Sequence, residues 1–174
     1  MSFLSRVFGS TPSSKSSEDP KSVQVLLEKL QPLSDEKARE LACLAYVLGR
    51  IAAADEEITA DESSSISALL QERGGLSLEQ AALVTEVALG EARHMGGTQD
   101  YLVTRQLQTL VSRKRREEIL DCLLAVAAAD GSICSQEESE LKAVSRQLGF
   151  QNKEFLEALS RYREYRTVLR GVGA

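Results

Sequence analysis

Residues 52–58 read AAADEEI, and residues 127–133 read AAADGSI. Each stretch follows an apolar run with helical spacing, and another helical pattern begins soon after it. At a constant offset of 75 residues, many positions are identical, including Leu48 and Leu123, Asp55 and Asp130, Ile58 and Ile133, Glu62 and Glu137, and Gly74 and Gly149. We therefore predict a duplicated helix–loop–helix unit, whose copies pack around one core because one unit cannot bury its apolar face alone.

The rest of the chain also favours helices. Proline occurs only at positions 12, 20 and 32, and no segment alternates between apolar and polar residues as a strand does. We expect an all-α fold: a single domain over residues 23–170, with about seven to eight helices in two pseudo-symmetric helix–loop–helix repeats. The repeat halves are expected at about 34–90 and 112–165. Residues 1–22 are rich in serine, proline and charge, which predicts a flexible N-terminal segment.

Capping residues predict where several helices begin. Ser and Thr accept a hydrogen bond from the first helical turn, and a Glu or Gln three residues later returns one. The predicted capping boxes are Thr59/Glu62, Ser77/Gln80 and Ser135/Glu138, with single caps at Ser34 and Asn152.

Asp55 and Asp130 each stand at a predicted helix end, where the helix dipole is already negative. One explanation is a local turn in which the carboxylate accepts backbone N–H groups. The other is a cation site, because Glu62 and Glu137 lie seven residues further on and each loop can fold its Asp and Glu towards one point. An EF-hand is excluded, because Val126 and Ala128 would occupy its first and third ligand positions.

A family resemblance follows from the second copy. The stretch LLAVAAADGSICSQEESELKAVSRQLGF (residues 123–150) resembles the tellurite-resistance TerB-like family, and residues 48–74 resemble a more degenerate copy of the same motif. The resemblance implies an all-helical domain tied to tellurite resistance and stress. It also implies a divalent metal ion, Ca²⁺ or Mg²⁺, held by acidic residues, which here are Asp130, Glu137, Asp55 and Glu62. Glu56 stands where the motif expects glycine, so a left-handed turn is costlier in the first copy.

Other chemistry has little support in the sequence. The single histidine, His94, excludes a His-dependent triad and a multi-imidazole metal site, and no nucleotide-binding motif occurs. A net charge of −5 argues against nucleic-acid binding. Three cysteines without a CxxC spacing indicate reduced thiols and a cytoplasmic protein.

The N-terminal segment carries a short apolar stripe: Phe3, Leu4, Val7 and Phe8. This stripe has three alternative roles: it docks on a membrane surface, on a partner, or back on the folded body. We expect a non-enzymatic, stress-associated protein that acts through a protein partner, with a divalent cation at its acidic loops. The alternative is an adaptor or scaffold that docks on a membrane surface or a chaperone system without a metal.

Overall fold

The structure is a computed structural model, and it describes residues 19–30, 33–94 and 98–170. These residues form eight helices of nine residues or more, one short helix and one 3₁₀ turn, and they contain no strand. The elements are α1 (Lys21–Lys29), α2 (Asp35–Ala52), α3 (Ala60–Gly74), α4 (Leu78–His94), α5 (Thr98–Leu110), α6 (Arg113–Ala127), α7 (Ser135–Gln147), α8 (Asn152–Ser160), η1 (Arg163–Tyr165) and α9 (Thr167–Arg170). The predicted all-α fold is confirmed. In the part described, no helix combines the length and apolar character needed to cross a membrane.

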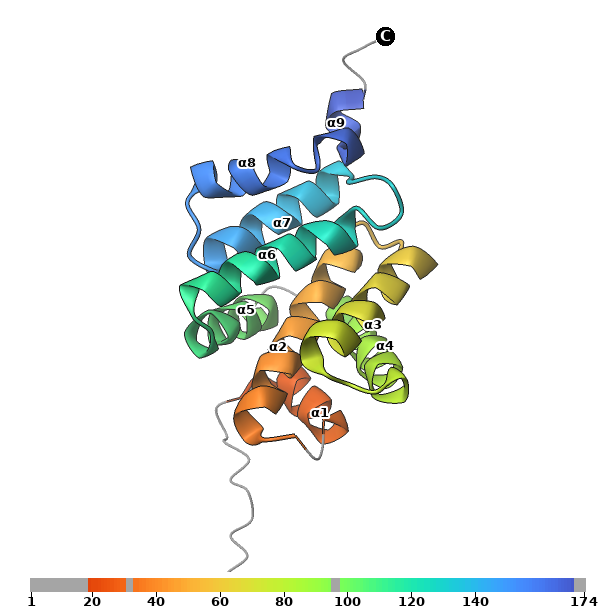
Figure 1. The fold of residues 1–174 in the computed structure, drawn as a ribbon, viewed down its shortest axis with the longest axis vertical. Coiled ribbons are helices and arrows are strands. Elements are labelled where there is room, and N and C mark those ends of the chain that lie inside the picture. The colour runs from red at the N-terminus through yellow and green to blue at the C-terminus, as the bar shows by residue number, and fades with distance from the viewer. Residues whose placement is uncertain (1–18, 31–32, 95–97, 171–174) are drawn as a thin grey trace, which may run out of the picture.

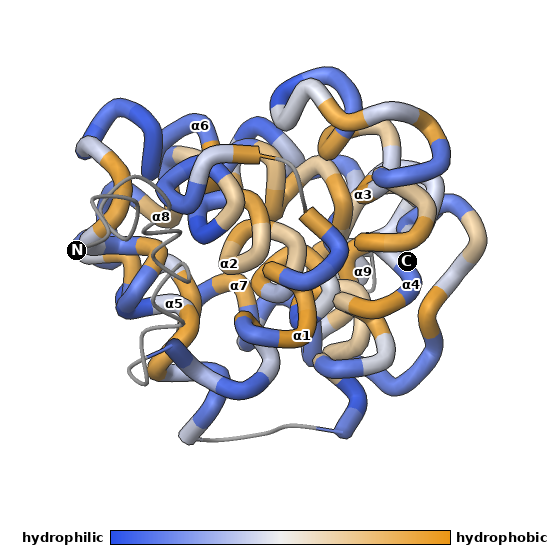
Figure 2. Tube along the Cα trace, turned by 90° about the horizontal axis from the view of Figure 1, so that it is seen from below, coloured by the Kyte–Doolittle hydropathy of each residue, from blue (hydrophilic) through white to orange (hydrophobic). Residues whose placement is uncertain are grey.

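Helix α2 is the centre of the fold (Figures 1 and 2). The sequence predicts one buried face on this helix, yet every residue from Leu41 to Ala52 is buried. The reason is that α2 contacts six other helices, α1 and α3–α7, so no face of its second half reaches solvent. Gly49 allows α4 to approach closely, because a Cβ there would lie 3.0 Å from the carbonyl oxygen of Ala88 in α4.

The two predicted helix–loop–helix units pack against each other. Helices α2 and α3 form the first unit, α6 and α7 form the second, and contacts of α6 with α2 and α3 and of α7 with α2 join them. Helices α6, α7 and α8 lie side by side in the upper part of Figure 1. The buried apolar residues of both units belong to one core. Their common origin by duplication stays a prediction.

A buried arginine fixes α2 against α5 and α7. Arg50 is 8% exposed, and its guanidinium pairs with Glu140 of α7. It also donates to Thr104 Oγ1 and Gln147 Oε1, both at 3.0 Å, and to the carbonyl of Asp100 at 3.2 Å. A buried charge is tolerated only when it is fully hydrogen-bonded in this way. Nothing in the apolar periodicity of α2 indicates this role.

Asp19, the first residue that the structure describes, is fastened to the helical body. The Asp19 side chain is buried, pairs with Arg39 Nε at 3.1 Å and accepts a hydrogen bond from Gln106 Nε2 at 2.5 Å. These contacts fasten the start of α1 to α2 and α5. The stripe of Phe3, Leu4, Val7 and Phe8 lies outside the described residues.

The capping predictions are partly confirmed. Thr59/Glu62 and Ser77/Gln80 form both hydrogen bonds of a capping box. Two other predictions are wrong by one residue: α7 is capped by Cys134 with Glu137, and α8 by Gln151, whose N–H donates to Glu154 at 2.7 Å. At α7 the cysteine sulfur takes the place of a hydroxyl, which leaves the predicted residues, Ser135 and Glu138, inside the first helical turn. Ser34 precedes α2 but makes no side-chain cap.

Candidate functional site

The two acidic loops, residues 53–59 and 128–134, lie next to each other where α2 meets α3 and α6 meets α7 (Figure 1). A direct contact joins them, because the thiol of Cys134 donates to Asp55 Oδ2 at 3.8 Å. Burial raises the pKa of Glu62, and the charge of Asp130 from the other loop adds to that shift. The structure thus brings the four predicted acidic residues, two from each copy, into one region.

Both aspartates make the predicted local turn. Asp55 Oδ1 accepts the backbone N–H of Glu57 at 3.0 Å, and Asp130 Oδ1 accepts that of Ser132 at 2.8 Å. The residue between takes a positive φ in each loop, 68° at Glu56 and 91° at Gly131. A glutamate therefore holds the left-handed conformation that the motif gives to glycine, at a cost of about 1 kcal/mol. The turn keeps each aspartate at the surface.

The two glutamates are buried instead. Glu62 is 3% exposed and Glu137 is 5% exposed, although each lies in the first turn of the helix that follows its acidic loop. One carboxyl oxygen of each closes a capping box: Glu62 Oε2 accepts the N–H of Thr59 at 2.8 Å, and Glu137 Oε2 accepts the N–H of Cys134 at 2.8 Å. The two carboxyls also lie close enough to influence each other's pKa across the junction of the two units.

Two neighbouring buried carboxyls favour holding one proton between them, and the direction of both pKa shifts agrees with this. The pKa of Glu137 is raised to about 7, chiefly by burial, with the charge of Glu62 adding to the shift and the hydrogen bonds from Cys134 opposing it. Burial also raises the pKa of Glu62, while hydrogen bonds from Thr59 and Glu137 lower it. The two carboxyls therefore retain one proton between them below about pH 7. The pair titrates as a unit, since two adjacent carboxylates repel each other.

The ligand atoms here, carboxylate oxygens, are of the type that binds a divalent cation, but few side chains are available as ligands. Carboxylate oxygens are the ligands that Ca²⁺ and Mg²⁺ prefer, and a cation between Glu62 and Glu137 would replace their shared proton. Among the described residues, however, no three Asp, Glu, His or Cys side chains converge at metal-binding distances. One carboxylate oxygen each of Asp55 and Asp130 is taken by its own loop, and the other oxygen of Asp55 accepts from Cys134. Backbone carbonyls or water would have to complete the coordination.

The comparison with known families settles where this chain belongs. The sequence model described as "Tellurite resistance protein TerB" matches residues 40–160, which include both acidic loops and both capping glutamates. The chain is a member of the TerB family. The resemblance drawn from residues 123–150 is thereby confirmed. Comparison with curated proteins and with solved structures finds no match.

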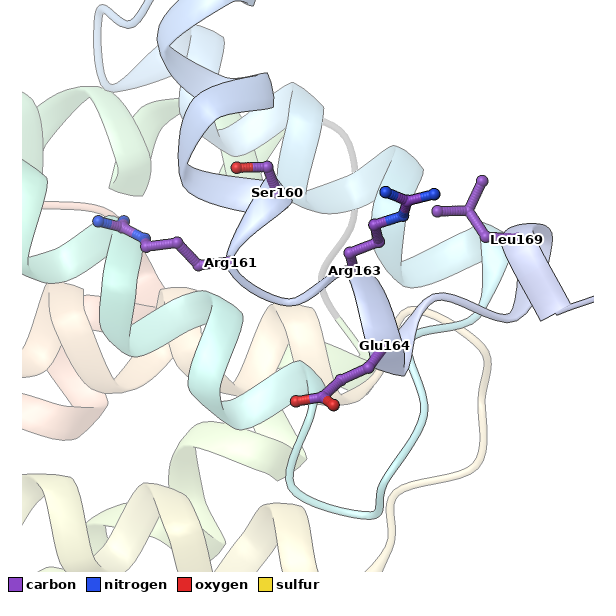
Figure 3. A pocket seen from close by; sticks show the side chains of 5 residues that line it. All are labelled: Ser160, Arg161, Arg163, Glu164 and Leu169. Carbon is purple, nitrogen blue, oxygen red and sulfur yellow. The ribbon is translucent and has the colours of Figure 1, made fainter.

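Two other places within the described residues do not form a comparable site. A hollow of about 490 Å³ lies between α8 and the C-terminal residues, where Arg161, Arg163 and Glu164 point away from one another (Figure 3). His94 ends α4, is exposed and contacts the carbonyl oxygen of Gly90 at 2.6 Å. Neither place gathers groups that could share a ligand.

The basic run at the start of α6 is used within the fold. Arg113 pairs with Glu154 and lies 4.2 Å over the ring of Phe150, and Arg115 pairs with Glu40 at 3.0 Å. Arg116 donates to the carbonyl of Leu148 at 2.8 Å. These guanidinium groups bind protein acceptors, so the run does not present an open phosphate-binding surface.

Cys134 is the site residue that sequence reasoning missed. It accepts the N–H of Glu137 at 3.4 Å while its own thiol reaches Asp55. Burial raises its pKa, so it remains a neutral thiol at physiological pH. The signal was present: at an offset of 75 residues, Cys134 matches the capping residue Thr59. Cysteine is a rare helix cap, and the neighbouring serine was the more usual choice.

Proposed function

We propose that this TerB family protein acts without catalysis, as a stress-associated protein that binds a protein partner. A divalent cation, Ca²⁺ or Mg²⁺, binds between Glu62 and Glu137 in this proposal, beside Asp55 and Asp130. The observation that carries it is the buried carboxyl pair at the junction of the two repeats. A pair of acids with a raised pKa is costly to bury and is characteristic of functional sites.

The cation would link the two halves of the fold. Glu62 lies in the first turn of α3 and Glu137 in the first turn of α7. One ion bound by both would replace the shared proton with two carboxylate–cation contacts. The ion must displace the proton of Glu137, so affinity should rise with pH across its pKa of about 7. Binding would tighten the contact between the two units and so alter the surface that a partner meets.

Calorimetric titration of the metal-free protein tests this proposal. We expect saturable binding of Ca²⁺ or Mg²⁺ at pH 8, with proton release and weaker binding at pH 6. Glu137→Gln should abolish it, because an amide keeps the capping hydrogen bond but carries no charge. Glu138→Gln is the matched control, since Glu138 pairs with Arg166 at 2.7 Å rather than with Glu62. No binding by either ion at pH 8, or equal loss in both variants, would contradict the metal site.

Three unpaired cysteines, Cys43, Cys122 and Cys134, support a cytoplasmic location as part of the proposal. The absence of a second histidine supports the non-enzymatic role. The adaptor alternative, with docking on a membrane or chaperone system, depends on residues 3–8 and stays a prediction.

A further inference from the structure

In the second repeat, the tail (residues 163–170) covers Ile133 of the acidic loop. Ile133 is fully buried, and its N–H donates to the carbonyl of Tyr165 at 2.7 Å. Its own carbonyl accepts the N–H of Thr167 at 3.0 Å. These two bonds form a parallel bridge between Ile133 and Arg166. Arg166 then pairs with Glu138 through both arms of its guanidinium, at 2.7 and 2.8 Å.

The equivalent position of the first repeat is uncovered. Ile58 matches Ile133 at the offset of 75 residues, and it follows the same turn and precedes the same capping box. Within the described part of the chain, neither the N–H nor the carbonyl of Ile58 makes a hydrogen bond. Its side chain is only partly buried against the core. The backbone N–H and carbonyl that hold the tail in one repeat are therefore open in the other.

A groove runs from this open position between α3 and α4. It encloses about 770 Å³ and begins at Ile58. Its floor is lined by small or short side chains of the two helices, including Ala60, Ser63, Ser67, Thr85 and Gly90. Small residues on two facing helices leave room for a third segment. In the second repeat, the segment that pairs with the loop is a short stretch of backbone that makes two hydrogen bonds to Ile133.

We propose that this groove is a docking slot for an extended segment, and that its occupant is residues 4–8 of the same chain. In the tail, the bridging residue Arg166 is followed by Thr167 and Val168; in LSRVF, Arg6 is followed by Val7 and Phe8. With Arg6 in the place of Arg166, the N–H of Ile58 donates to the carbonyl of Ser5, and the N–H of Val7 donates to the carbonyl of Ile58. Leu4, Arg6 and Phe8 then point to one side, into the groove.

Charge supports this occupant. Arg6 is the only charged side chain among residues 1–14. Glu86 lines the groove, is exposed, and makes no ion pair within the described ranges. Glu57 and Asp61 flank the open backbone of Ile58 and are both exposed. Arg93 also lines the groove, but these three acidic side chains outnumber it, so a segment with a single arginine meets a net negative charge.

The segment is also long enough. Asp19 pairs with Arg39 of α2, and Arg39 is 13 residues, or about 20 Å of helix, from Ala52 at the end of α2. Ile58 follows Ala52 by six residues. Thirteen residues separate Arg6 from Asp19 and reach about 43 Å when extended.

Fluorescence of the full chain tests this inference, because the sequence contains no tryptophan. Phe8→Trp introduces a single indole into the segment. We expect its emission to be blue-shifted, and acrylamide quenching to be at least threefold weaker than in a free peptide of residues 1–18 with the same substitution. Ser64→Arg, which blocks the groove, should restore full quenching. Ser139→Arg, at the matched position of the second repeat, should leave the protection unchanged.

A charge exchange makes the test specific. Glu86→Arg should release the segment, and adding Arg6→Glu should restore protection. Quenching equal to that of the free peptide would overturn the proposal, as would protection that survives Ser64→Arg. Protection that grows with protein concentration and accompanies a dimer would show that the slot takes a second copy's segment, which also overturns it. Protection seen only with phosphatidylglycerol vesicles would assign the segment to a membrane and overturn it equally.

Discussion

The loop at residues 53–59 and the loop at residues 128–134 do the same local work in different surroundings. Each uses an aspartate to close a turn and a buried glutamate to cap the next helix. They differ in what covers them: the tail pairs with Ile133, whereas Ile58 has an open backbone in the described structure. The residues that both loops have in common thus build the junction and its carboxyl pair. The tail, which covers only the second loop, leaves the first loop open to another segment.

The largest expected difference concerns the two isoleucines. Ile133→Ala should lower the free energy of unfolding by about 3 kcal/mol, because it leaves a cavity under the tail. Ile58→Ala should cost about 1 kcal/mol, because its side chain is already partly exposed. Urea denaturation of both variants gives the comparison. Equal costs would mean that the tail does not distinguish the two loops.

The carboxyl pair should make stability depend on pH in an unusual direction. The folded-state pKa of Glu137, about 7, lies above the ordinary value of a glutamate, so the folded protein keeps a proton that the unfolded chain loses between pH 4.5 and 7. The stabilisation is therefore complete below pH 4.5 and is lost as the pH rises through 7. Between pH 5 and 8, the metal-free protein should lose about 1–3 kcal/mol from this pair.

Glu137→Gln should remove that dependence. Its amide can donate to Glu62 at every pH, so the variant should be about 1–2 kcal/mol more stable than the parent at pH 8 and nearly level with it at pH 5. Urea denaturation at a series of pH values in the presence of a chelator measures this. Glu138→Gln should change stability without flattening the pH profile. A wild-type profile that is already flat from pH 5 to 8 would rule out the shared proton.

The turn residues should show a smaller contrast. Gly131→Ala should cost about 1–2 kcal/mol, because φ at this position is 91° and an L side chain is strained there. Glu56→Ala should change stability by less than about 0.5 kcal/mol, because the first loop already holds an L residue at φ 68°. Thermal unfolding of the two variants measures this difference in stability. A large cost at Glu56 would show that its side chain, rather than its backbone, holds the turn.

Much of the fold was predictable because its signals are local. Helical periodicity and the absence of proline gave the elements, and Thr59/Glu62 gave a correct helix start. The cap at Cys134 was missed because propensity favours serine over cysteine, although the repeat offset pointed to it. The all-round burial of α2 and the role of Arg50 depend on six neighbouring helices, which no local pattern records. The two glutamates were predicted as a candidate site. Their proximity across the repeats depends on how α3 and α7 pack, which residues 75 positions apart in the sequence do not reveal.

The central claim is that Glu62 and Glu137 share one proton, which a divalent cation can replace. Carbon-13 NMR of the side-chain carboxyls across pH 4–9 tests it directly, with assignment from Glu62→Gln and Glu137→Gln. We expect Glu137 to titrate near pH 7 in metal-free protein, with Glu62 sensing the same transition. Saturating Ca²⁺ or Mg²⁺ should remove that transition. Independent titration of both carboxyls near pH 4.5 would contradict the account.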